Sequence, residues 1–273
     1  MKKIALLTGF LFLISCGNGS NQTDNGFTEK VHLTTKTTWY IQLKVDEEHP
    51  LRYIKEAKLY DIDLFDTKPE LISRLKKDGK IVICYFSAGS YEDWRPDKDK
   101  FPKEAIGKPL DGWYGEYWLD IRNPKVRQIM VDRMQLAKEK GCDGVDPDNV
   151  NGYENDTGFD LTYEDQLDYN TFIAEKAHKL GLLVGLKNDL NQIEDLVDYF
   201  DFSVNEECHQ YNECDLLMPF VEEGKPVFNI EYDKKYLYET NFKLLCEDAR
   251  QRDFRTLVLP LELDGSFVKS CDY

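Results

Sequence analysis

Short apolar runs alternate along the chain with segments in which apolar residues recur every three or four positions. The apolar runs predict strands at 39–43, 60–65, 80–89, 143–148, 182–189, 201–206, 226–232 and 256–263. The intervening segments, such as PELISRLKKDG and NPKVRQIMVDRMQLAKEKG, have the periodicity of amphipathic helices. Glycines at 79, 141 and 181 each lie between a helical segment and the next strand, where a left-handed helix end favours glycine.

This alternation predicts an α/β fold, and more specifically a (β/α)8 TIM barrel formed as a single domain by residues 35–273. An open doubly wound sheet is the alternative. No glycine-rich phosphate-binding sequence follows the first strand, which favours the barrel. The segment YWLDIR at 117–122 is an additional candidate, which we interpret as a short extra strand or a piece carried by a loop.

The N-terminal residues have the layout of an export signal. Lys2 and Lys3 precede an apolar run from Ile4 to Ile14, and this run is too short to span a bilayer. The ending Leu-Ile-Ser-Cys resembles a bacterial lipobox, so we expect a lipoprotein signal peptide at 1–15 and lipidation of Cys16. An ordinary cleaved signal with a chance cysteine is the alternative. Residues 16–34 are mostly polar, as is typical of a flexible tether.

These features predict an exported protein that is lipid-anchored to the bacterial cell envelope, at the outer membrane or cell surface, and that contacts the membrane only through its N-terminal lipid. The formal net charge of −16 disfavours nucleic acid and anionic polysaccharide and favours a cationic partner. Many of these charges are expected to be solvated surface. We expect a monomer.

The chain has seven cysteines, and an exported protein can pair those that are not lipidated. The disulfide candidates are Cys208 with Cys214 and Cys246 with Cys271. Cys84, in an apolar strand, and Cys142, beside a glycine, are expected to be buried free thiols. A zinc site is the alternative use, but no CxxC pair or Cys/His cluster is present, and no metal or other cofactor is expected.

Polar and acidic residues gather at the C-terminal ends of six predicted strands. They include Asp61, Asp63, Tyr85, Asp146, Asp148, Lys187, Asp189, Asn205, Glu206 and Glu231. In TIM barrels this rim carries the active site, because the loops that follow the strands converge there. Helix capping explains one or two such residues. Six strands with polar ends therefore predict a functional cleft.

Asp146 and Asp148 are two positions apart and so share one face of their strand. Two carboxyl groups across a cleft are the requirement of glycoside hydrolysis, one ionised and one protonated. A calcium loop starting at Asp146 is the rival, but it would need a ligand at Val150 and a glycine at Asn151. Aromatic residues are frequent in the neighbouring segments, and sugar rings stack on such side chains.

Several motifs carry a resemblance to a known family. They are YDIDLFDT, VICYFSAGSYEDWRPD, GKPLDGW, WLDIR, DGVDPDNVNGY, NDTGFDLT, LKND, NEEC and ECDLL. In this order they resemble the endo-α-1,4-polygalactosaminidase family, number 114 among glycoside hydrolases, from about Thr37 to Cys271. The resemblance implies a TIM barrel that cleaves α-1,4-linked galactosamine-containing polysaccharide internally. It also implies an electronegative cleft for this cationic amino-sugar chain.

By position, Asp148 and Glu206 match the family's catalytic pair, and we hypothesise that Asp148 is the nucleophile and Glu206 the acid/base. The family usually has Glu-Pro-Asp-Asn where this chain has an aspartate at 146, and Asn-Glu-Gln-Cys where it has a glutamate at 207. Lys187 either binds substrate or pairs with a neighbouring carboxylate. The expected substrate-binding residues are Asp61, Asp63, Tyr85, Asp120, Asp146, Asn149, Lys187, Asp189, Asn205 and Glu231.

Two other functions stay open from the sequence, namely a carbohydrate-binding barrel without catalysis and a hydrolase of another α-linked polysaccharide. The stereochemical outcome also stays open. Carboxyl groups about 5–5.5 Å apart would indicate retention, and a separation of roughly 6.5–9.5 Å would indicate inversion.

Overall fold

A computed structural model describes residues 31–273, and Val31–Tyr273 forms one compact unit. The predicted signal peptide, Cys16 and most of the predicted tether lie outside the described residues. Leu33 is 7% exposed and packs in the core, so the packed body already includes residues that we assigned to the tether. Among the described residues, no helix has the length and apolarity that crossing a membrane requires.

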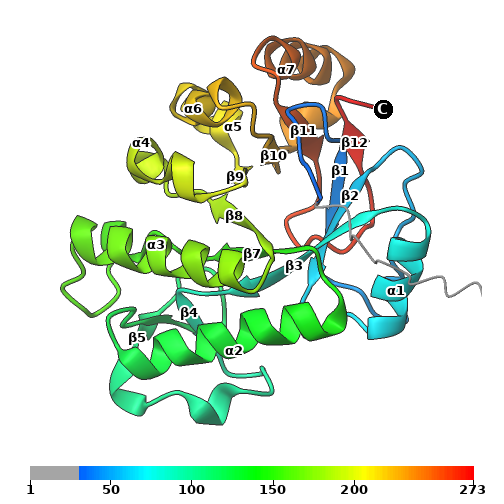
Figure 1. The fold of residues 1–273 in the computed structure, drawn as a ribbon. Coiled ribbons are helices and arrows are strands. Elements are labelled where there is room, and N and C mark those ends of the chain that lie inside the picture. The colour runs from blue at the N-terminus through cyan, green and yellow to red at the C-terminus, as the bar shows by residue number, and fades with distance from the viewer. Residues whose placement is uncertain (1–30) are drawn as a thin grey trace, which may run out of the picture. The chain divides into compact units, whose positions relative to one another are not determined.

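All eight predicted strands are present in one sheet. They are β1 (Trp39–Gln42), β2 (Leu59–Asp63), β3 (Ile81–Ser87), β7 (Gly144–Asp148), β8 (Leu183–Lys187), β9 (Phe202–Glu206), β10 (Val227–Glu231) and β11 (Arg255–Val258). They pair in this order, each parallel to the next. The sheet curls so that the helices cover its outer side (Figure 1). The prediction of an α/β barrel-like fold is therefore confirmed.

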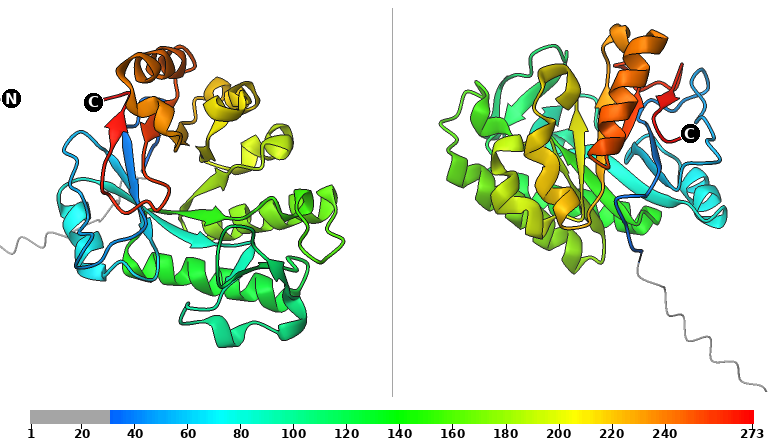
Figure 2. Two further views of the ribbon diagram at one scale, coloured as in Figure 1. Left: turned by 180° about the vertical axis from the view of Figure 1, so that it is seen from behind. Right: turned by 90° about the horizontal axis from the view of Figure 1, so that it is seen from above.

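The two edges of the curled sheet meet through side chains and loops. The short strand β12 (Lys269–Ser270) pairs antiparallel with β11, and the sheet order runs from β1 to β12. Trp39 Nε1 donates to the carbonyl of Arg255 at 2.7 Å, and the Tyr273 hydroxyl donates to the carbonyl of Trp39 at 3.0 Å. Figure 2 shows the C-terminal segment beside β1. These contacts hold the first and last strands together.

The longer helices lie in the connections between strands. They are α1 (Pro69–Lys77), α2 (Pro124–Lys140), α3 (Tyr163–Lys179) and α7 (Glu239–Gln251), with short helices α4 (Ile193–Leu196), α5 (Cys208–Tyr211) and α6 (Met218–Glu222). Single 3-10 turns occur at Lys98–Lys100, Lys103–Ala105, Gly152–Glu154, Leu190–Gln192, Val197–Tyr199, Cys214–Leu217 and Lys234–Leu237.

Local sequence accounts for several helix boundaries. The Asn123 side chain accepts from the Lys125 N–H at the start of α2, and α3 begins with a capping box between Thr162 and Asp165. The predicted helix end at Gly141 has the positive φ of 92° that favours glycine. Each of the four longer helices buries apolar residues on one side, and this burial holds the helix against the rest of the fold.

A second, antiparallel sheet is inserted between β3 and α2. It has the order β4-β6-β5, with β4 (Ser90–Glu92), β5 (Ile106–Pro109) and β6 (Glu116–Leu119). The expected extra piece at 117–122 is therefore partly β6. Gly89 precedes β4 and lies so close to the end of β7 that a Cβ there would be 1.7 Å from the carbonyl oxygen of Asn149. The insertion is thereby held against the C-terminal rim of the barrel.

Among the described residues, disulfides join Cys84 to Cys142, Cys208 to Cys214 and Cys246 to Cys271. Both predicted pairs are confirmed. The prediction of free thiols at Cys84 and Cys142 is wrong. Cys84 lies on β3 and Cys142 just before β7, and the parallel pairing of these strands brings together two cysteines 58 residues apart in the sequence.

Candidate active site

A cleft of about 470 Å³ opens at the C-terminal rim of the barrel. Loops after β1 and β11 form part of its wall, and the inserted sheet forms another part. Six residues predicted from the strand ends and their motifs line it, namely Asp63, Tyr85, Asp148, Asn149, Lys187 and Glu206. The convergence of parallel strand ends therefore places the predicted catalytic pair in one cavity.

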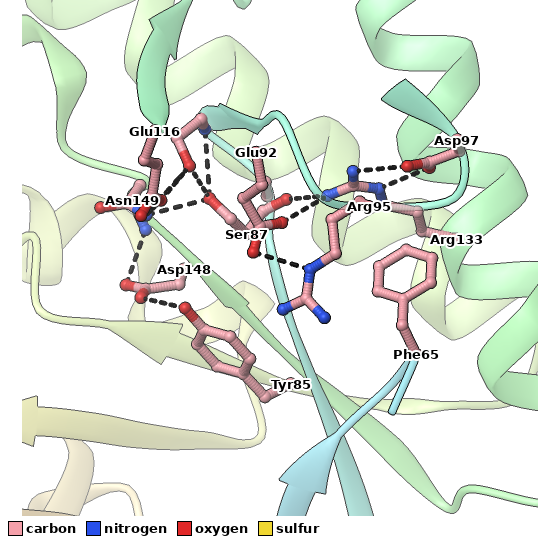
Figure 3. A network of polar contacts seen from close by, with 12 residues as sticks. Phe65, Tyr85, Ser87, Glu92, Arg95, Asp97, Glu116, Arg133, Asp148 and Asn149 are labelled. Atoms are coloured by element: carbon pink, nitrogen blue, oxygen red, sulfur yellow. Dashed lines mark hydrogen bonds and ion pairs between the residues drawn. The ribbon is translucent and has the colours of Figure 1, made fainter. Parts of the chain in front are cut away.

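Asp148 is the last residue of β7, and two donors fix its carboxylate. The Tyr85 hydroxyl donates to Oδ2 at 2.8 Å, and the backbone N–H of Asn149 donates to Oδ1 at 2.7 Å (Figure 3). Desolvation, followed by the charge of Asp148, holds the pKa of Tyr85 well above its usual value, so the hydroxyl stays a donor. The carboxylate is thus oriented before any substrate binds.

Glu206 is the last residue of β9, and a similar pair of donors holds it. The Tyr232 hydroxyl donates to Oε1 at 2.5 Å, and Asn188 Nδ2 donates to Oε2 at 3.1 Å. Burial, followed by the charge of Glu206, raises the pKa of Tyr232 well above its usual value. Each of the two carboxylates therefore has a tyrosine that remains protonated at neutral pH.

Lys187 ends β8, the strand between those that carry Asp148 and Glu206. Its Nζ lies 3.4 Å from Asp148 Oδ1 and 3.6 Å from Glu206 Oε2, so these oxygens are separated by at most the sum of those distances, about 7 Å. Burial alone would lower the pKa of Lys187, but Asp148, Glu206 and further carboxyl groups raise it. The lysine is therefore a buried cation between the two carboxylates.

Asp61 and Asp146, whose carboxyl groups interact with this cation, are buried at 1% and 0% exposure. Burial raises the pKa of both carboxyl groups, and their mutual contact raises that of Asp61 further. Neither oxygen of Asp146 has a hydrogen-bond donor among the described side chains and backbone groups, so a proton on Asp61 is the donor that the pair requires. These two residues do not line the cleft, but the negative charge that they carry when ionised raises the pKa of Lys187.

Glu116 of the inserted sheet is a cleft residue that the sequence reasoning missed. Its Oε1 accepts from Asn149 Nδ2 at 3.2 Å and from the Ser90 hydroxyl (Figure 3). Burial raises its pKa to about 7. Asn149 thus joins the carboxyl group of Glu116 to the backbone turn that holds Asp148. The signal of Glu116 in the sequence is weak, because this residue begins a short strand outside the eight-strand pattern.

A buried ion-pair group forms the wall beside Glu116. Arg95 donates to Glu92 Oε1 at 2.7 Å and to Asp63 Oδ2 at 2.6 Å. Asp63, predicted to bind substrate, therefore already has a charged partner. Arg133 of α2 binds Asp97 at 2.9 Å and extends the same network outward (Figure 3). The network fixes the inserted sheet against the barrel.

Four other predicted substrate-binding residues lie outside the cleft lining. Asp120 pairs with Arg122 at 2.9 Å on a surface turn. The remaining three, Asp189, Asn205 and Glu231, are buried and accept hydrogen bonds within the protein. Their donors are, in that order, Asn170 Nδ2, the Cys208 N–H and the His209 N–H. Their side chains stabilise turns behind the rim. A position at a strand end alone does not tell such a structural side chain from one that binds substrate.

The cysteine and histidine group at 208, 209 and 214 does not change this picture. The sulfur atoms of Cys208 and Cys214 are bonded to each other, so they are not free thiolate ligands for a metal. The chemistry that the described cleft offers is therefore that of its carboxyl groups, tyrosines and lysine.

The sequence model of glycoside-hydrolase family GH114 matches residues 20–273. The chain belongs to glycoside-hydrolase family GH114. The GH114 chain is thus a glycoside hydrolase, and the alternative of a binding barrel without catalysis is set aside. Its cleft contains Asp148 and Glu206, the two carboxyl groups that we expect to perform glycoside hydrolysis.

Solved structures agree with this assignment. Aspergillus fumigatus Ega3, whose crystal structure is a complex with galactosamine, is 42% identical to the GH114 chain, with a TM-score of 0.80 over 89% of this chain and 98% of that one. The glycoside hydrolase domain of PelA from Pseudomonas aeruginosa shares the fold, at 14% identity and a TM-score of 0.63 over 84% and 96% of the two chains.

A curated relative is also similar in part. An uncharacterized protein of Methanocaldococcus jannaschii is 34% identical over 89 residues. This similarity covers 31% of the GH114 chain and 26% of the relative, so the chain spans about a quarter of that protein's length.

Proposed function

We propose that this protein hydrolyses α-1,4-linked galactosamine-containing polysaccharide at internal bonds. The observation that carries the proposal is the placement of Asp148 and Glu206 on either side of the Lys187 ammonium group in an open cleft. The similarity to Ega3, which binds galactosamine in its crystal structure, supports the choice of sugar.

The charge of the cleft supports a cationic substrate. Seven acidic side chains line it (Asp63, Asp66, Glu92, Glu116, Asp148, Glu206, Glu262), against three basic ones (Lys44, Arg95, Lys187). Arg95 and Lys187 are buried within ion pairs that offset part of this acidic charge, and the acidic side chains still outnumber the basic ones. Such a cleft attracts the ammonium groups of unacetylated amino sugars and repels anionic chains.

The proposed mechanism assigns different roles to the two carboxyl groups. Asp148 attacks the anomeric carbon, while protonated Glu206 gives its proton to the leaving glycosidic oxygen as that bond breaks. Water then attacks the same carbon and gives its proton to the Glu206 carboxylate, and the ester bond to Asp148 breaks. Two inversions at one carbon give net retention, with which the upper limit of about 7 Å between the carboxylate oxygens is compatible.

The test is to incubate the protein with partly deacetylated α-1,4-galactosaminogalactan and to size the products. A fall in average chain length, with new ends that retain the α configuration by proton NMR, supports the proposal. An unchanged chain length contradicts the proposal. Cleavage of the fully acetylated chain alone would show that the substrate is the acetylated polymer and not the galactosamine-containing one. Full activity in both Asp148→Asn and Glu206→Gln would refute the site assignment.

We further propose that the protein acts outside the cytoplasm as a lipid-anchored monomer. The signal-like residues before Cys16 support export and lipidation. The disulfides among the described residues also support an oxidising compartment. Incorporation of labelled palmitate that Cys16→Ser abolishes would support the anchor, and equal labelling of both proteins would refute it. Light scattering of the delipidated protein tests the monomer.

A further inference from the structure

A second groove adjoins the catalytic cleft. It has a volume of about 580 Å³ and lies between the β5–β6 hairpin and the loop that follows β7. Four residues line both the cleft and the groove, namely Leu110, Trp113, Asn149 and Asn151. The two cavities are therefore neighbours along one path that leads away from Asp148.

The backbone holds this groove in place. The Lys108 N–H of β5 donates to the carbonyl of Thr157 at 2.8 Å, which ties the hairpin to the loop. Gly107 permits this approach, because a Cβ there would be 2.2 Å from the same carbonyl oxygen. Across the hairpin, the Leu110 N–H donates to the carbonyl of Glu116 at 2.8 Å. The groove is thus preformed and does not depend on a ligand.

The side chains at the junction suit a sugar. Trp113 is 51% exposed and lines both cavities, so its indole ring is available as an apolar surface for a pyranose ring. Asn151 lines both cavities; its backbone carbonyl accepts from Asn155 Nδ2, whereas its side-chain amide forms no hydrogen bond with any described residue. A flat aromatic surface beside a free amide is a recurring combination for binding polar rings.

The groove also contains an acidic side chain that is available to a cation. Lys108 pairs with Asp156 at 2.6 Å, whereas Asp111 forms no ion pair with any described residue. Asp111 is exposed and lines the groove but not the cleft. An ammonium group on a sugar bound there would meet this carboxylate.

We propose that the groove binds further galactosamine units of the polymer whose scissile bond lies at Asp148. This inference rests on the proposed function. It adds the path of the bound polysaccharide, which leaves the cleft past Trp113 and over the β5–β6 hairpin. A distal binding region favours long chains over short ones, because the enzyme then gains affinity from units remote from the reacting bond.

The experiment measures kcat/KM on α-1,4-galactosamine oligomers of increasing length. Wild-type kcat/KM should rise with length until the groove is filled. Asp111→Lys should lower it about fivefold for long oligomers and leave short ones unchanged. Trp113→Ala should lower it about tenfold for long oligomers, with a smaller loss for short ones.

Two matched controls change the same side-chain types outside the groove. Tyr114→Ala removes a fully exposed aromatic ring next to Trp113, and Glu104→Lys reverses an exposed charge in the same insertion. Both should follow the wild-type length dependence. If Asp111→Lys and Trp113→Ala change kcat/KM by the same factor at every length, or not at all, the inference is overturned while the proposed function stands. If the wild-type protein cleaves none of the oligomers, the proposed function itself fails.

Discussion

The ammonium group of Lys187 lies 3.4 Å from Oδ1 of Asp148, and both residues end neighbouring parallel strands. This buried cation also contacts Glu206, and its charge interacts with the buried carboxyl groups of Asp61 and Asp146. Removing its charge leaves several carboxyl groups without compensation. Stability and activity therefore both depend on the ammonium group of Lys187.

We predict that Lys187→Met lowers the free energy of unfolding by about 3 kcal/mol at pH 7, because a buried charge loses its partner. The loss should be smaller at pH 5, where Asp146, whose pKa burial raises, is protonated. Turnover should fall about a hundredfold or more. Urea unfolding and kcat measure the two effects. Lys243→Met, at a side chain 74% exposed, is the control, and an equally mild effect at both lysines would contradict the prediction.

Asp148 and Glu206 should differ in how they respond to the leaving group. Replacement of Asp148 by Ala should lower the turnover rate of every substrate about a thousandfold or more, because the covalent intermediate cannot form. Replacement of Glu206 by Ala should abolish polysaccharide cleavage but preserve formation of the intermediate from a glycosyl fluoride, which needs no proton. Pre-steady-state kinetics measure this step. If the Asp148 variant and not the Glu206 variant forms the intermediate from the glycosyl fluoride, Glu206 is the nucleophile and Asp148 the acid/base.

Tyr85→Phe and Tyr232→Phe should each lower kcat about tenfold, since each removes one donor to a carboxylate that we propose to be catalytic. The tyrosines hold different carboxylates, but Lys187 contacts both carboxylates, so the losses in the double variant should depart from additivity. An unchanged KM of both variants for a short oligomer would show that the loss lies in the chemical step and not in substrate binding. Tyr53→Phe, at a half-exposed ring outside the cleft, should behave like wild type.

Glu116 should make stability depend on pH. Burial raises its pKa from the usual 4.5 to about 7, so the folded protein holds a proton that the unfolded chain releases between these values. Its contribution to stability is complete below pH 4.5 and is lost as the pH rises through 7. Between pH 4.5 and 8, Glu116→Gln should remove a decline of roughly 2 to 3 kcal/mol. Urea titrations at several pH values measure the slope, and an identical slope in both proteins would contradict the assignment.

The Cys84–Cys142 disulfide should contribute more stability than the Cys208–Cys214 disulfide. The first closes a separation of 58 residues and the second one of 6. In the chain-entropy model this difference amounts to about 2 kcal/mol. Paired serine variants, compared by urea unfolding under oxidising conditions, test the difference. A larger loss for the short loop would indicate that native-state packing, and not chain entropy, decides the effect.

Positions at strand ends were predictable, whereas the roles of their side chains were not. Alternation on β7 correctly places Asp146 and Asp148 on one face. The depth along the strand then separates them, since Asp146 is fully buried and Asp148 reaches the cleft. Glu116 shows the opposite case. It lies far from every barrel strand in the sequence and reaches the cleft only because the inserted sheet folds over the rim.

The sequence by itself determined the eight strands, their parallel order and the motifs that carry the proposed catalytic pair, because these depend on local periodicity and on residues a few positions apart. Only the tertiary structure decided the pairing of Cys84 with Cys142, the burial of Asp61 and Asp146, and the place of Lys187 between Asp148 and Glu206. These relationships join strands that are distant in the chain. Their energies depend on burial and on distances of a few ångströms, which arise only when the sheet curls and the strand ends converge.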